Sequence, residues 1–227
     1  MNQMNQDQVF LEGEGDQWFL RNQMALENDC KFDWHCYLID LLEQKEEIRK
    51  IVELGCSNGW RLHQLSQKLG QGKFVGIDAS LEAIQDGKRR YSELSLHQGL
   101  LSQVPLQEEF DLVILNSVLC WVDRSSLVKS ITEIDRLTKD GGFLLIGDFL
   151  PDVQHRRHYH HRPTEKLYTY KQDYTKIFKS LGTYQEMARF TFNHDKRELA
   201  LETCESSSRF SCVMLHKSLY GFYPEIA

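Results

Sequence analysis

Glu53-Leu54-Gly55-Cys56-Ser57-Asn58-Gly59 is the segment of this sequence from which the fold class can be inferred. An apolar run at 50–54 ends in it, and leucines at helical spacing follow over 60–69. A buried strand that leads through glycines into a helix is typical of a ligand-binding loop, because glycine lets the backbone approach a ligand and the helix offers unpaired N–H groups. A dinucleotide site would read Gly-x-Gly-x-x-Gly. Ser57 occupies the second glycine position and Gly59 comes one residue early, so the spacing disfavours a dinucleotide.

Two acidic residues indicate what kind of ligand this loop binds. Glu53 lies two residues before the first glycine, where a carboxylate suits a ligand with an ammonium and a sulfonium group better than one with phosphates. Asp78 ends the next predicted strand, 23 residues after Gly55, where an acid can accept hydrogen bonds from both ribose hydroxyls. Alone, each is also compatible with a plain turn or a helix cap, but together at this spacing they favour a binding site.

Predicted strands and helices alternate over the first 150 residues. An apolar periodicity predicts helices over 33–50, 60–69, 80–91 (with Ser80 as the cap) and 125–138, the last ended by Gly141-Gly142. Short apolar runs predict strands over 50–54, 73–77, 95–98, 110–115 and 143–148. After Pro151 we expect a loop, a helix over 172–181 and two strands near 184–192 and 209–216. The prediction is an α/β fold: a Rossmann-like, doubly wound, seven-stranded, mostly parallel sheet with a C-terminal antiparallel pair.

The domain organisation that we expect is simple. Residues 1–227 form one domain, in which 1–32 are a lead-in segment able to act as a lid. Residues 33–150 form the cofactor-binding core, and 151–227 supply a substrate loop and the C-terminal strands.

The composition restricts the location and the partners of the chain. Its 227 residues, 41% hydrophobic and 26% charged, are ordinary for a globular protein, and no apolar run approaches the roughly 18 residues that span a bilayer. The N-terminus lacks the pattern of a signal peptide, and the six cysteines show neither C-x-x-C nor zinc spacing, so we expect a cytoplasmic protein. A net charge of −6 disfavours nucleic acid and membrane partners. The sequence is compatible with a homodimer.

Four segments in order, 52–59, 76–80, 110–114 and 137–143, resemble the successive motifs of class I S-adenosylmethionine-dependent methyltransferases, a likeness that covers about 45–150. The resemblance implies S-adenosyl-L-methionine as methyl donor and S-adenosyl-L-homocysteine as product. It implies that the methionine part is held by Glu53, Gly55, Cys56, Ser57, Asn58 and Gly59, the ribose by Asp78, and that Ala79 lies beside the adenine.

The implied site continues at residues 100–101 and 116–117. Leu100 and Leu101 follow Gly99, where many family members carry an acid near the adenine amino group, so a backbone carbonyl is expected to replace that contact. Asn116 and Ser117, at the end of the fourth strand, fall where the family lines the donor cleft.

The flanking segments 14–22, 148–151, 159–161 and 170–174 resemble a bacterial subgroup of methyltransferases (type 11/25-like) associated with surface-glycan and sugar biosynthesis. This resemblance implies a small-molecule acceptor, such as a sugar or a sugar-derived metabolite.

The histidine-rich segment 155–162 directly follows the fifth strand and carries the candidate catalytic residues. It is either a solvated loop or a loop that binds substrate and supplies a general base, for which Tyr159, His160 and His161 are the candidates. A metal site is disfavoured because carboxylate or thiolate ligands with regular spacing are missing. The arginines of this segment, Arg157 among them, either clamp an anionic group or form an exposed face.

Other candidates for a lid or for substrate contact lie outside this loop. Trp18, Arg21 and Asn22 either fold over the cofactor as a lid or attach the N-terminus to the core. Tyr170 and Lys171 are further candidates, although a tyrosine there is also compatible with packing.

Three functions therefore compete. The first is a methyltransferase that acts on a small molecule, the second a methyltransferase that acts on RNA or protein, and the third a non-catalytic, methyltransferase-like binding subunit. The acidic balance opposes RNA, and the intact Glu53, Gly55, Gly59 and Asp78 favour retained cofactor binding.

Overall fold

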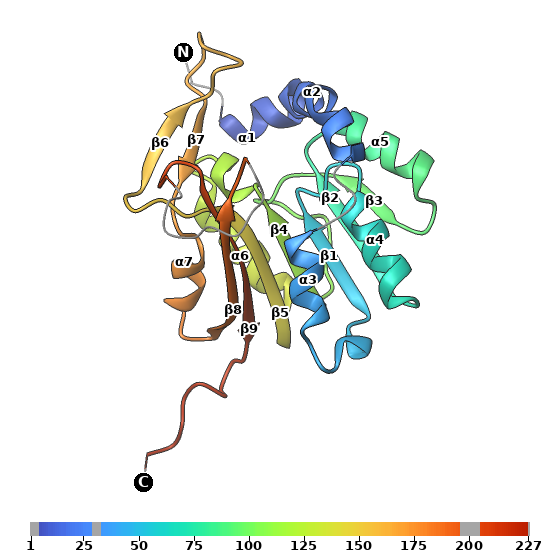
Figure 1. Ribbon diagram of the computed structural model, residues 1–227, viewed down its shortest axis with the longest axis vertical. Helices are drawn as coiled ribbons and strands as arrows, with labels where there is room; N and C mark the ends of the chain where they lie inside the picture. The colour runs from blue at the N-terminus through green and yellow to red at the C-terminus, as the bar shows by residue number, and fades with distance from the viewer. Residues whose placement is uncertain (1–4, 29–32, 196–204, 227) are drawn as a thin grey trace.

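The computed structural model describes residues 5–28, 33–195 and 205–226. Its centre is a seven-stranded sheet in the order β3-β2-β1-β4-β5-β9-β8, and a separate two-stranded sheet pairs β6 with β7 (Figure 1). The five strands β3, β2, β1, β4 and β5 are parallel, whereas β9 is antiparallel to both β5 and β8. The predicted fold class is confirmed. The strands of the large sheet are β1 (Lys50–Leu54), β2 (Lys73–Asp78), β3 (Ser95–Gln98), β4 (Phe110–Asn116), β5 (Thr138–Phe149), β8 (Tyr184–Asn193) and β9 (Arg209–Lys217).

Helices cover both faces of this sheet. One core cluster packs β-strand side chains against α3 (Trp34–Asp40), α4 (Trp60–Leu69) and α5 (Leu81–Arg90), and the other packs them against α6 (Leu127–Leu137) and α7 (Thr175–Lys179). Successive side chains of a strand point to opposite faces, so Leu112 belongs to the first cluster and Val113 to the second. Burial on both faces explains why the central strands are nearly continuous apolar runs.

Local sequence signals account for several boundaries. The hydroxyl oxygen of Ser80 accepts a hydrogen bond from the Ala83 amide at 3.0 Å, which confirms the predicted cap of α5. Asp33 caps α3 in the same way, through the amides of His35 and Cys36 at 3.0 Å each.

Two predicted boundaries are wrong. The helix predicted over 33–50 ends at Asp40, and only a short 3-10 helix, η2 (Lys45–Glu47), follows. The reason is that the apolar periodicity lapses over the polar stretch 43–47. Gly141-Gly142 does not stop α6 but lies inside β5, because Thr138 turns directly into an extended conformation and pairs with Phe110. Phe110 of β4 pairs with Thr138 and Leu112 pairs with Phe143, so the register between β4 and β5 is irregular there. The two glycines lie in the extra residues of β5 at this irregularity.

The segment after Pro151 contains structure that the sequence did not predict. β6 (His155–His158) and β7 (Tyr168–Lys171) form an antiparallel hairpin inside the expected loop. The helix expected over 172–181 is reduced to α7. The two late strands were predicted correctly and extend the sheet as an antiparallel pair.

The N-terminal lead-in is helical and consists of α1 (Gln6–Val9), the π-helix η1 (Phe10–Glu14) and α2 (Gly15–Asn28). It lies across one end of the sheet, between the β6–β7 hairpin and α5 (Figure 1). The Gln6 side chain donates to the carbonyls of Trp121 (2.6 Å) and Tyr168 (2.9 Å). At the other end, Asp16 accepts from the Ser80 hydroxyl at 2.7 Å. The lead-in is thus attached on both sides. Within the described ranges, no helix is long and apolar enough to cross a membrane.

Candidate active site

A cavity of about 380 Å³ opens at the carboxyl ends of β1, β2 and β4, beneath the lead-in helices. This is the edge of an open α/β sheet where ligands bind, and the volume falls within the range of small-molecule sites, about 300–1,000 Å³. Most of the predicted cofactor residues line it: Glu53, Gly55, Cys56, Ser57, Asp78, Ala79, Leu100, Leu101, Asn116 and Ser117. Asn58 and Gly59 belong to the same loop but are not among the lining residues, and Trp18 of α2 lines the cavity from above.

The backbone of the loop after β1 is unusual. Gly55 has φ +77°, and a Cβ atom there would overlap the side chain of Val118, so this position requires glycine. Within the described residues, only two non-glycine residues have positive φ, Ser57 (52°) and Ser117 (55°). Both line the cavity. Such backbone strain persists where surrounding structure enforces it, and it is concentrated at functional sites.

Asp78 connects the end of β2 to this loop. One carboxylate oxygen accepts from the Ser57 amide at 2.7 Å and the other from the Ser80 amide at 2.8 Å. Burial raises the pKa of Asp78, and the two amide donors oppose that shift. Each carboxylate oxygen has capacity for one more donor, so Asp78 can hold the loop and still accept from a ligand hydroxyl.

Glu53 presents an unpaired carboxylate oxygen inside the cavity. One of its oxygens, Oε1, is paired with Arg61, whereas Oε2 is buried and has no hydrogen-bond partner within the described part of the chain. Burial raises the pKa of Glu53 to about 7, against the neighbouring guanidinium of Arg61, which lowers it. A buried acceptor without a donor is costly. A ligand ammonium group would satisfy it, and the sequence predicted this contact.

Five charged or titratable residues that line the cavity were not predicted from the sequence: Asp7, Asp33, His35, Arg61 and His194. Arg61 is buried on α4 and donates to Asp33 through Nε at 3.1 Å and Nη2 at 3.0 Å, as well as to Glu53. Although burial raises the pKa of Asp33, the Arg61 guanidinium holds it well below its usual range. The sequence signal for this cluster was that Arg61 lies on the apolar face of an expected helix. Its partners, Asp33 and Glu53, come from other segments and could not be paired with it from the sequence.

One wall of the cavity is aromatic. Trp34 lies at 5.5 Å from Phe192 between ring centroids, with the two rings nearly parallel, and Phe192 lies at 5.3 Å from Phe210. All three residues line the cavity, as does His194. The late antiparallel pair β8–β9 thereby brings aromatic side chains to α3 at one side of the site.

A model of the methyltransferase domain family matches residues 45–191, which is more than half of the chain. The chain belongs to this family. A malonyl-(acyl-carrier protein) O-methyltransferase of Halalkalibacterium halodurans is 23% identical over 53% of this chain and 48% of its own length. A trans-aconitate 2-methyltransferase of Afipia carboxidovorans is 25% identical over 47% and 42%. The chain therefore spans about half the length of these curated relatives.

Solved structures give the same class of fold. An S-adenosylmethionine-dependent methyltransferase from Clostridium acetobutylicum superposes with a TM-score of 0.61 at 13% identity, over 88% of this chain and 99% of that one. The predicted enzyme class and the predicted donor, S-adenosylmethionine, are confirmed at the level of the family. The glycine loop, Asp78 and the unpaired oxygen of Glu53 fit that donor.

In this methyltransferase domain the three predicted catalytic residues do not line the cavity. Tyr159 is buried, and its hydroxyl donates to Glu14 at 2.7 Å and accepts from Arg21 at 2.6 Å. Burial also raises the pKa of Tyr159. His160 and His161 are exposed beside it. The structure thus shows Tyr159 joining the hairpin to the lead-in helices, and the catalytic role of the three residues stays a prediction.

Of the other predicted substrate or lid residues, Arg21, Arg157, Tyr170 and Lys171 are outside the cavity lining. Arg157 is exposed on β6. The ring centroid of Tyr170 lies 4.2 Å from the guanidinium carbon of Arg124. Lys171 is buried, donates to the Ser207 carbonyl at 2.9 Å and lies 3.5 Å from the ring centroid of Phe149. Trp18 and Asn22 are the members of this group that line the cavity.

Proposed function

We propose that this methyltransferase domain transfers the methyl group of S-adenosylmethionine to a small-molecule acceptor. The observation that carries the proposal is the unpaired, buried Oε2 of Glu53, which lines the same cavity as Asp78. A ligand with an ammonium group at one end and ribose hydroxyls at the other would satisfy both acids. The donor supplies an electrophilic methyl group, and the chain supplies alignment and exclusion of water.

The proposal of a small-molecule acceptor draws on two relatives and on the position of the lead-in helices. The names of two relatives, malonyl-(acyl-carrier protein) O-methyltransferase and trans-aconitate 2-methyltransferase, specify acceptors for those proteins. The lead-in helices lie over the cavity, which favours a small acceptor over a folded RNA or protein. We retain the predicted cytoplasmic location as part of this proposal. The sugar acceptor and the homodimer stay predictions.

The donor site can be tested with two ligands that differ at one end. S-adenosylhomocysteine and 5′-methylthioadenosine share the adenosine and the sulfur, but only the former has an ammonium group. Glu53→Gln should weaken the binding of S-adenosylhomocysteine by about 10- to 100-fold, since a hydrogen bond to a charged group is worth about 1.5–3 kcal/mol. The affinity for methylthioadenosine should not change. Asp78→Asn should weaken both. Calorimetric titration of the unaltered protein and the two variants with each ligand measures the six dissociation constants.

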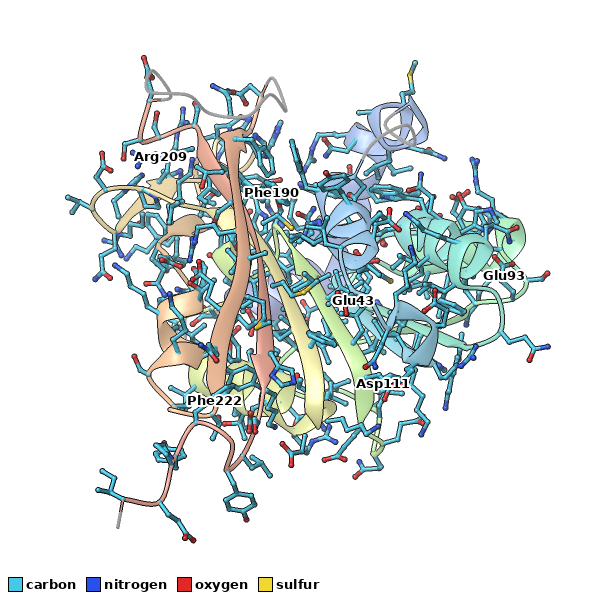
Figure 2. All side chains as sticks on the ribbon, turned by 60° about the horizontal axis from the view of Figure 1, so that its bottom comes forward. Glu43, Glu93, Asp111, Phe190, Arg209 and Phe222 are labelled. Carbon is cyan, nitrogen blue, oxygen red and sulfur yellow. The ribbon has the colours of Figure 1, made fainter. Side chains whose placement is uncertain are left out.

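The control for these variants is Glu43→Gln, an exposed acid labelled in Figure 2 that does not line the cavity. It should change neither affinity. Failure of the unaltered protein to bind S-adenosylhomocysteine at millimolar concentration would refute the donor. Equal losses of affinity for both ligands in Glu53→Gln would show that Glu53 does not bind the ammonium group.

Donor affinity should depend on pH through Glu53. Its pKa is about 7 in the free protein, and a ligand ammonium binds the ionised form, so the affinity for S-adenosylhomocysteine should rise as the pH rises through about 7. Below that value each pH unit should weaken binding by up to about tenfold. Glu53→Gln should flatten this dependence, and a slope that persists in the variant would assign it to another group. Titrations between about pH 5.5 and pH 8.5 measure the slope.

A further inference from the structure

His35 occupies a position in the cavity that only the tertiary structure creates. The residue is 2% exposed, lies on α3 and lines the cavity. Its ring lies against Gly147 near the end of β5: a Cβ atom at that glycine would lie 2.6 Å from Nε2 and 2.5 Å from Oδ1 of Asn116. The absence of a side chain at 147 therefore makes room for the imidazole beside Asn116.

The two ring nitrogens of His35 have different surroundings. Nδ1 lies 3.5 Å from Oδ1 of Asp33, a carboxylate that Arg61 and the α3 amides hold in place. Nε2 is buried and has no hydrogen-bond partner within the described residues. A carboxylate beside Nδ1 favours the tautomer with its proton on that atom, which leaves a lone pair on Nε2. This is the arrangement of a base oriented by a third group.

The charges around His35 keep the ring neutral. Burial lowers its pKa below the ordinary 6.5, and Arg61 acts in the same direction. Asp33 and the Leu115 carbonyl oppose the shift. Glu53, the other carboxylate paired with Arg61, completes the charged groups of this cluster. At physiological pH the imidazole is therefore uncharged and can accept a proton.

The space next to this base suits a flat, uncharged ring. Trp34 and Phe192 line the same cavity as His35. Phe190, on the same face of β8 as Phe192 and labelled in Figure 2, lies 5.0 Å from Trp34 between ring centroids. Among the described residues that line the cavity, the ionisable groups are mostly acidic, and the one guanidinium is shared between two acids. An anionic acceptor would be repelled. The charged lining residues are Asp7, Asp33, Glu53, Asp78 and Arg61.

We propose that His35 is the general base of this methyltransferase and that the acceptor is a neutral phenol, whose hydroxyl donates to Nε2 while its ring packs against Trp34 and Phe192. This inference rests on the proposed function. A phenol, with a pKa near that of tyrosine, about 10, releases its proton to an imidazole far more readily than an aliphatic alcohol, whose hydroxyl is closer to water at about 15.7. That difference favours a phenol over the sugar predicted from the sequence.

The reaction balances without any other reactant. The phenol O–H bond breaks and its proton goes to His35 Nε2, while the oxygen electron pair forms a bond to the methyl carbon of S-adenosylmethionine. The carbon–sulfur bond breaks, its electron pair stays on sulfur, and S-adenosylhomocysteine leaves as a neutral thioether. The imidazolium, stabilised by Asp33, returns its proton to solvent.

The test uses His35→Gln and the matched surface variant His97→Gln, an exposed residue of β3. Methyl transfer to 4-methylphenol is measured with radiolabelled S-adenosylmethionine, and binding of S-adenosylhomocysteine by calorimetry. His35→Gln should lose about 10²- to 10⁴-fold in kcat, the usual contribution of a general base, while S-adenosylhomocysteine affinity is retained. His97→Gln should match the unaltered protein. Loss of donor affinity in His35→Gln would instead make His35 a donor-binding residue and overturn the proposal.

Two further measurements distinguish a base from a structural residue. With 4-nitrophenol at mildly alkaline pH the acceptor is already ionised. The acidic lining should weaken its binding, but at saturating acceptor the ratio of kcat between the unaltered protein and His35→Gln should fall sharply. The kcat of the unaltered protein should fall on the acid side, at a pH lower than the ordinary imidazole pKa of 6.5, because burial lowers the pKa of His35 and the ring becomes protonated only there. This acid limb should vanish in His35→Gln.

The outcomes also separate this inference from the function it rests on. If S-adenosylhomocysteine binds but methyl glucoside is methylated and phenols are not, the phenol is refuted and the donor stands. If turnover survives His35→Gln and is lost in the double variant His160→Ala, His161→Ala, the base belongs to the hairpin loop. If S-adenosylhomocysteine does not bind, the proposed function fails and this inference fails with it.

Discussion

Replacing Gly55 by alanine should destabilise the protein strongly and abolish donor binding. The backbone at this position has φ +77°, which costs an L-residue roughly 1–2 kcal/mol, and the added methyl group would overlap the side chain of Val118. Overpacking adds typically about 1–3 kcal/mol. The chain can relieve the overlap only by moving the loop away from Val118, and this shift would displace Glu53 and Ser57. Urea unfolding followed by the fluorescence of the four tryptophans measures the loss.

Gly141 provides a matched control for this variant. Its φ is +78°, almost the same, but a Cβ atom there would meet nothing within 4 Å. Gly141→Ala should therefore cost only the conformational part, roughly 1–2 kcal/mol, and leave S-adenosylhomocysteine affinity unchanged. Equal losses of stability in the two variants would show that the overlap with Val118 contributes nothing.

Replacing Arg61 by methionine should lower the free energy of unfolding by a similar amount. Arg61 is 4% exposed and neutralises two buried carboxylates, those of Asp33 and Glu53. Removing one partner of a buried ion pair costs about 3–5 kcal/mol because it leaves uncompensated charge. We expect a lower free energy of unfolding and weaker donor binding, because Glu53 then stays protonated to higher pH. The exposed Arg89, paired with Asp86 at 3.5 Å, is the control, and Arg89→Met should leave stability unchanged.

The pH dependence of the Arg61→Met deficit gives a sharper test. In the unaltered protein the depressed pKa of Asp33 contributes stability that is present above the ordinary value of 3.8 and lost as the pH falls through the lower folded value. In the variant both buried carboxylates have raised pKa values, so stability is lost as the pH rises from the ordinary 3.8 and 4.5 toward those raised values. The deficit should be largest at about pH 8 and smallest near pH 4. A deficit that does not change with pH would show that lost packing, not charge, is the cause.

The succession of strands and helices could be predicted because each element carries its own signal. β1 and α4 have the predicted bounds, since a short apolar run and a leucine periodicity adjoin the glycine loop. Ser80 was recognised as a cap from its position alone. The failures occur where a tertiary contact overrides the local pattern. Gly141-Gly142 reads as a helix stop, but Thr138 pairs with Phe110 and begins β5 earlier. Alternating His and Arg residues at 155–158 reveal no strand, since β6 is exposed and lacks an apolar face.

The donor half of the site is readable from the sequence for a physical reason. Glu53, the glycine loop and Asp78 belong to consecutive elements of one β-α-β unit, and parallel pairing of β1 with β2 brings their ends together. The acceptor half is not readable in this way. His35 reaches Asn116 only because Gly147 leaves space, and Trp34 meets Phe192 only because β9 inserts antiparallel between β5 and β8. These contacts join segments far apart in the chain, so they depend on the strand order of the completed sheet. Local residue spacing therefore defines the methyl donor, and the tertiary packing places the base and the aromatic wall that would receive the acceptor.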